Sequence, residues 1–140
     1  MYENLLPHET SLEYISYHED SFKYQLLEEL AVQTRIYPTV PIHTKDIDLM
    51  ANGVLRIAAG FPSDGPSGPT IDTDTFMRGA FAHDALYKLL REGLLDQRWR
   101  VPADRELQRI CLEDGMWCVR ACWVYTGLQI AKGKHAKPAA

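Results

Sequence analysis

Two ionisable residues lie on the otherwise apolar faces of two neighbouring predicted helices. His83 occupies a row with the i, i+4, i+7 spacing of a core-facing helix, whose other members are Phe76, Ala80, Tyr87 and Leu90. Asp104 aligns in the same way with Leu107 and Cys111. When a histidine and an aspartate face one interior, the carboxylate can fix the imidazole tautomer and stabilise its charged form. The spacing therefore predicts a proton-handling dyad in which His83 acts as a general base on water.

The length of the chain between these residues permits the pairing. His83 lies about ten residues, or roughly 15 Å, before the end of its predicted helix. The connection 94–101 can extend over roughly 26 Å, so it can return Asp104 to the level of His83. The same residue types also permit a structural interpretation, in which His83 is a satisfied core histidine and Asp104 a helix-start residue.

Asp84 points about 100° away from His83 on the same helix, so it cannot take the same role. Lys88 lies one turn further on, at the spacing of an ordinary surface ion pair. The alternative is that Asp84 binds a hard cation such as calcium, which takes roughly six to eight oxygen ligands. The glycine-rich loop 60–69 could supply backbone carbonyls, since glycine lets the chain turn several of them toward one centre.

The composition is that of an ordinary globular domain, with 140 residues, 46% hydrophobic and 24% charged. A net charge of −4 gives no general attraction to nucleic acid, and we expect no nucleic-acid partner. The three cysteines are too few for a disulfide framework, and no two histidines have metal-ligand spacing, so we expect no zinc site. With neither a charged-then-apolar leader nor an apolar run of about 18 residues, we expect no signal peptide and no transmembrane segment.

Strand patterns fill the first part of the chain. Alternation of apolar and polar residues predicts strands over 12–17, 22–26, 30–37 and 53–59, with a short helical turn near 46–50. Three glycines and three prolines within 60–70 then predict a long loop without regular structure.

Helical patterns fill the remainder. They predict helices over 74–91, 102–114 and 116–130, with Gly93 and Gly115 ending the first two. Strands followed by helices predict an α+β fold: antiparallel strands, a glycine/proline-rich loop and three helices, with the His–Asp pair between the first two. We expect one domain over 1–131, with strands at about 10–59, the loop at 60–72, helices at about 74–131, and a flexible basic tail at 132–140.

The pattern His83-Asp84-x-x-Tyr87, followed by a helix with Ala103-Asp104, resembles the active site of phospholipase A2 enzymes. The short type in parvovirus capsid proteins is the most similar, and the resemblance spans about 60–132. It implies that His83 activates water, that Asp104 orients His83, and that the Tyr87 hydroxyl supports this catalytic set.

The loop Gly65-Pro-Ser-Gly-Pro69 is similar in character to the calcium loop of that group. The resemblance therefore implies Ca²⁺ as the cofactor. Asp84 would bind the ion together with the backbone carbonyls of Gly65 and Gly68, and the ion would polarise an ester carbonyl. Leu86 stands where those enzymes carry a disulfide-bonded cysteine, and the viral type also lacks that disulfide.

A second resemblance covers more of the chain. The three blocks Gly60-Phe61-x-x-Asp64-Gly65-x-Ser67, His83-Asp84-x-Leu86-Tyr87 and Ala103-Asp104 are similar in order and spacing to an uncharacterised family of tailed bacteriophages and prophages. This implies a structural or accessory phage protein of the tail or of assembly. It would be made in the host cytoplasm, have other phage proteins as partners, and associate with the virion.

The alternative function is a calcium-dependent phospholipase or esterase that acts on host membrane lipid. A third open interpretation is a small protein made during infection that binds a host factor or a small ligand.

Overall fold

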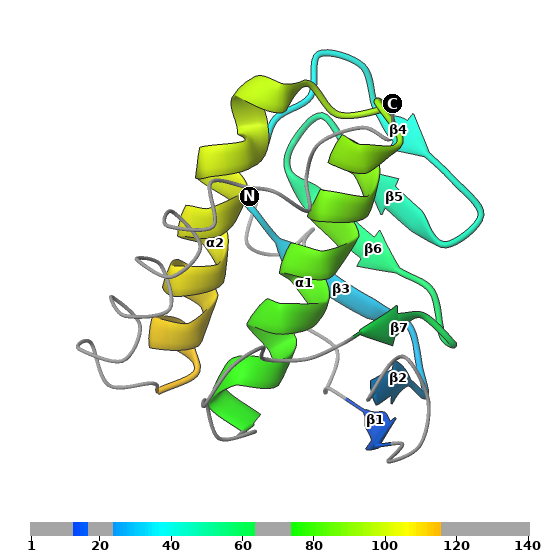
Figure 1. Ribbon diagram of the computed structural model, residues 1–140, viewed down its shortest axis with the longest axis vertical. Coiled ribbons are helices and arrows are strands. Elements are labelled where there is room, and N and C mark those ends of the chain that lie inside the picture. The colour runs from blue at the N-terminus through cyan, green and yellow to red at the C-terminus, as the bar shows by residue number, and fades with distance from the viewer. Residues whose placement is uncertain (1–12, 17–23, 64–73, 116–140) are drawn as a thin grey trace. The chain divides into compact units, whose positions relative to one another are not determined.

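The structure, a computed structural model, describes residues 13–16, 24–63 and 74–115 (Figure 1). The chain divides into two compact units, Met1–Gly65 and Pro66–Ala140. Antiparallel strands form the first unit and helices the second, which confirms the predicted α+β class. The predicted third helix, the basic tail and residues 64–72 of the predicted loop lie outside the described residues. The single domain over 1–131 stays a prediction.

The strands of the first unit form two antiparallel sheets. One sheet has the order β1-β2-β7 and the other the order β3-β6-β5-β4. The strands are β1 (Tyr14–Ser16), β2 (Tyr24–Leu26), β3 (Leu30–Gln33), β4 (Ile42–His43), β5 (Ile47–Leu49), β6 (Val54–Ile57) and β7 (Pro62–Ser63). Apolar side chains from the second sheet are buried, among them Leu30, Val32, Ile47, Leu49, Leu55 and Ile57.

The loop predicted over 60–70 is wrong at its start, because Pro62 and Ser63 form β7 and pair with β2. Backbone bonds from Gly60 N to Leu26 O (2.8 Å) and from Leu26 N to Phe61 O (3.0 Å) continue this pairing. The pairing of β2 with β7 continues the register in which β3 pairs with β6, as if 24–33 and 54–63 were two long antiparallel segments. Pro62 is tolerated since β7 lies at the edge of its sheet, where a missing N–H breaks no ladder.

The helical turn predicted near 46–50 is also wrong, because Ile47–Leu49 form strand β5 between β4 and β6. Ile47 and Leu49 are buried while Asp48 is half-buried, which is the alternation of a strand with one covered face. The strand predicted over 53–59 is confirmed as β6.

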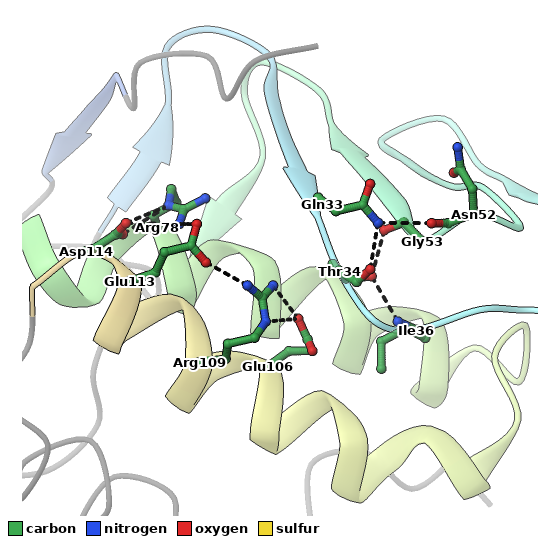
Figure 2. Close-up of polar contacts among 10 residues, drawn as sticks. All are labelled: Gln33, Thr34, Ile36, Asn52, Gly53, Arg78, Glu106, Arg109, Glu113 and Asp114. Atoms are coloured by element: carbon green, nitrogen blue, oxygen red, sulfur yellow. Dashed lines mark hydrogen bonds and ion pairs between the residues drawn. The ribbon is translucent and has the colours of Figure 1, made fainter. Parts of the chain in front are cut away.

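Strand β3 ends at Gln33, earlier than the predicted end at residue 37, because a turn begins at Thr34 (Figure 2). The Thr34 backbone N–H and hydroxyl both donate to the Gly53 carbonyl, at 2.9 and 2.7 Å. The same hydroxyl accepts from Ile36 N at 3.2 Å. Gly53 has φ +90°, and a Cβ there would lie 2.3 Å from the Thr34 carbonyl oxygen, so only glycine fits.

The helices of the second unit match the first two predicted helices. They are α1 (Asp74–Arg91), the single-turn 3₁₀ helix η2 (Gln97–Trp99) and α2 (Arg100–Glu113). Gly93 and Gly115 follow the α-helices with φ of 73° and 96°, the left-handed conformation that ends helices. Pro102 lies in the first turn of α2, where its missing N–H costs nothing.

α1 and α2 lie side by side and antiparallel (Figure 1). Gly79 marks a close approach, since a Cβ there would lie 2.8 Å from the Leu107 side chain and 3.1 Å from Cys111 Sγ. Figure 2 shows how charges hold the far end of this pair: the buried Arg78 guanidinium of α1 donates from Nε to both Asp114 oxygens at 3.0 Å. This contact fixes the register in which α1 presents its other polar residues to α2.

Candidate functional site

His83 of α1 and Asp104 of α2 meet between the two helices, which confirms the predicted pairing. His83 Nε2 lies 2.7 Å from Asp104 Oδ1. The Asp104 side chain is fully buried, and that of His83 is 8% exposed. A buried carboxylate that is ionised only accepts hydrogen bonds, so we assign the Nε2 proton to His83 as the donor.

Tyr87, one turn beyond His83 on α1, completes a second contact with the same carboxylate oxygen. Its hydroxyl donates to Asp104 Oδ1 at 2.5 Å, and its ring centroid lies 4.1 Å from that of His83. Burial, and next the hydrogen bond to the Asp104 carboxylate, raise the pKa of Tyr87 well above its usual range. The phenol therefore stays protonated and remains a donor.

Arg100, the first residue of α2, was not among the site residues predicted from the sequence. Its Nη1 donates to Asp104 Oδ2 at 3.2 Å, so the two oxygens of the carboxylate receive donors from different elements. The signal that could have found it is the i, i+4 spacing of Arg100 and Asp104, which places opposite charges on one helix face. The positive guanidinium compensates the charge of a carboxylate with 0% exposure.

The second ring nitrogen of His83 is the chemically available one. In the tautomer that donates from Nε2 to Asp104, Nδ1 is the nitrogen whose lone pair can accept a proton. Among the described residues, the charged group beside it is the Asp84 carboxylate, with Oδ1 4.0 Å from Nδ1. The dyad can therefore accept a proton at Nδ1, and Asp104 stabilises the imidazolium that results.

Asp84 lies on the exposed side of α1. Over residues 77–90, only Asp84 and Lys88 are half-exposed and the rest are buried. The Asp84 side chain is 34% exposed, so one hard oxygen ligand is present beside His83. The other predicted ligands, Gly65 and Gly68, lie outside the described residues. Within the described ranges, no cluster of three or more His, Cys, Asp or Glu side chains could hold a metal ion.

No protein-family model, curated protein or solved structure matches this chain. In the part of the chain that the structure describes, no helix is both long and apolar enough to cross a membrane. The geometry of the described residues is therefore the basis for a functional proposal.

Proposed function

We propose that this chain is an ester hydrolase with a phospholipase A2-like core, in which His83 is the general base. The observation that carries the proposal is the orientation of the imidazole: Nε2 is bonded to the buried Asp104 and Nδ1 is left to accept a proton. A base held by a carboxylate on its far nitrogen is the arrangement used to activate water.

In the proposed reaction, Nδ1 of His83 takes a proton from water as the oxygen attacks the ester carbonyl. The tetrahedral intermediate then collapses, the bond to the leaving alcohol breaks, and the imidazolium returns its proton to that alcohol. Asp104 orients the ring throughout and stabilises its positive charge. Tyr87 and Arg100 are positioning residues, because they contact the carboxylate and not the reacting atoms.

We propose calcium as the cofactor, and Asp84 is its one candidate ligand among the described residues. Asp84 would bind it, with backbone carbonyls of Gly65 and Gly68 as the further ligands implied by the resemblance. When bound, the ion supplies positive charge for the developing oxyanion. The two groups are adjacent, since Asp84 Oδ1 lies 4.0 Å from His83 Nδ1.

The test is release of fatty acid from mixed phospholipid vesicles and of alcohol from a soluble ester, each with calcium and with chelator. His83→Gln is the decisive variant, and His43→Gln is its matched control because the His43 side chain is 62% exposed in strand β4. We expect calcium-dependent release that His83→Gln abolishes and His43→Gln leaves intact, with far-ultraviolet circular dichroism unchanged in both. Equal activity of the His83 variant and the native protein would contradict the proposal.

The second candidate is a structural or accessory phage protein in which the same network only joins two helices. The complete burial of Asp104, with donors on both oxygens, favours it, because a fully satisfied polar network can specify how elements pack. Host cytoplasm, virion association and other phage proteins as partners belong to this candidate.

Replacing His83 and Asp104 by leucine and Tyr87 by phenylalanine separates the two candidates, because Tyr87 would otherwise keep a buried hydroxyl without its acceptor. A structural network replaced by apolar groups of similar volume leaves stability close to that of the native protein, and the protein should still support particle assembly. A folded triple variant that fails only in hydrolysis would contradict the structural candidate.

A further inference from the structure

The turn between β5 and β6 contains an Asn-Gly pair, a dipeptide whose backbone can attack its own side chain. The backbone nitrogen of the second residue reacts with the side-chain amide of the first, and glycine has no side chain to hinder the approach. Asn52 is exposed, and Gly53 follows it beside Thr34 at the end of β3 (Figure 2). The other asparagine of the chain, Asn4, is followed by a leucine, which hinders the same reaction there.

The electrophile of this reaction, Cγ of Asn52, is held in place by the turn. Asn52 Oδ1 accepts a hydrogen bond from Val54 N at 3.2 Å. This bond folds the side-chain amide toward the Gly53 nitrogen, which lies between the two residues in the backbone. A donor on a carbonyl oxygen also stabilises the negative charge that develops there during nucleophilic attack.

The nucleophile, the Gly53 nitrogen, is restrained by the same turn. Gly53 N donates to Met50 O at 2.9 Å. The Gly53 carbonyl accepts from the Thr34 backbone N–H at 2.9 Å and from the Thr34 hydroxyl at 2.7 Å. For attack on Asn52, the Gly53 nitrogen must lose its proton and rotate toward Cγ, so these bonds must open first. The opening of a single turn costs less free energy than global unfolding.

We propose that Asn52 is a site of spontaneous deamidation, and that the bonds from Thr34 to Gly53 set its rate. The Gly53 nitrogen loses its proton to solvent hydroxide and forms a bond to Asn52 Cγ. The bond from Cγ to the side-chain nitrogen then breaks, and that nitrogen takes a proton from water and leaves as ammonia. Water opens the resulting succinimide ring at either carbonyl, which gives aspartate or isoaspartate. The net reaction consumes water and releases ammonia, and no atom is oxidised or reduced.

Both products change the turn. Each carries a carboxylate in place of a neutral amide. Isoaspartate also lengthens the backbone by one carbon, because the chain then runs through the former side-chain carbonyl. The Gly53 carbonyl can then no longer meet Thr34 in its native position, and the contact that ends β3 is lost. Since all of these residues belong to the strand unit, the proposal does not rest on the hydrolase activity of His83.

The experiment follows deamidation of the full chain in mildly alkaline buffer by peptide mass spectrometry. Deamidated peptides are heavier by the difference between a hydroxyl and an amino group, and chromatography separates the isoaspartate form. The test variant is Thr34→Val, which removes the hydroxyl donor to Gly53. Thr44→Val is the matched control, because the Thr44 hydroxyl donates to Ile47 O at 2.9 Å in the neighbouring β4–β5 turn. Circular dichroism checks that both variants are folded.

We expect the folded native chain to accumulate aspartate and isoaspartate at position 52. One hydrogen bond shifts an equilibrium by about fivefold, so folded Thr34→Val should deamidate about fivefold faster than the native protein, and Thr44→Val at the native rate. In urea that unfolds all three proteins, Asn52 should react faster than in the folded native chain, ahead of Asn4, and at one common rate.

Three results would overturn the proposal. The first is a folded native chain in which Asn52 stays intact. The second is a folded Thr34→Val variant that deamidates no faster than Thr44→Val. The third is an equal rate at Asn52 in the folded and unfolded native chain, a comparison that needs no variant and therefore decides the question even if Thr34→Val does not fold.

Discussion

Tyr87→Phe is the sharpest test of the network around Asp104, because it removes one oxygen and keeps the ring. The lost hydroxyl donates to a carboxylate with 0% exposure, at 2.5 Å. A hydrogen bond to a charged group contributes about 1.5–3 kcal/mol, and part of this is offset since the phenol no longer has to be buried. We expect the free energy of unfolding to fall by about 2 kcal/mol.

Urea unfolding followed by circular dichroism measures this change. At about 2 kcal/mol per molar urea, the midpoint of Tyr87→Phe should fall by roughly 1 M. Tyr37→Phe is the matched control, because Tyr37 is 50% exposed, and its free energy of unfolding should change by less than about 0.5 kcal/mol.

Two results would refute this reasoning. One is a midpoint for Tyr87→Phe that matches that of Tyr37→Phe. The other is that Tyr87→Phe lowers the free energy of unfolding by the same amount in the Asp104→Asn variant as in the native protein. Because the hydroxyl acts through the carboxylate, its removal should cost much less once that charge is gone.

Two further predictions follow from the helical pair. Burial raises the pKa of Tyr87 above its ordinary 10.0, so on raising the pH the unfolded chain releases this proton before the folded protein does. The stabilisation that the protonated Tyr87 contributes to the folded state is therefore fully present below about pH 10 and is lost progressively as the pH rises above it. The difference in free energy of unfolding between the native protein and Tyr87→Phe should shrink by about 1.4 kcal/mol from about pH 9 to about pH 11, and a constant difference would contradict it. Gly79→Ala should lower the free energy of unfolding by about 1 kcal/mol, because crowding against Leu107 and Cys111 exceeds the gain in helix propensity; a higher urea midpoint would contradict it.

The helices and their pairing could be predicted because their signals are local. An apolar period of 3.6 and a following glycine predict both ends of α1 to the residue and those of α2 to within two residues. The distance along the chain then leaves His83 and Asp104 within reach of each other. Arg100 was missed because the first turn of α2 was expected to begin near Pro102, which left the i, i+4 pair with Asp104 outside the helix.

The errors lie in the strands, where pairing partners are distant in sequence. Ile47–Leu49 is short enough to read as a helical turn, and only its ladders to β4 and β6 make it a strand. The composition around Pro62–Ser63 is that of a glycine/proline loop. These two residues are nevertheless a strand, because they pair with β2 in the register that β3 and β6 also follow. A two-residue edge strand has no sequence pattern of its own.

Both candidate functions explain why Asp104 is buried with donors on each oxygen, so that carboxylate cannot distinguish them. A structural network has no use for the second nitrogen of His83, since Nε2 alone makes the bond to α2. A hydrolase requires that nitrogen to carry a lone pair and to reach water near Asp84. Nδ1 is therefore the atom on which the two functions differ, and a variant that keeps the Asp104 contact while removing Nδ1 tests catalysis alone. His83→Gln approaches this condition, because its amide N–H₂ can still donate to the carboxylate but offers no base.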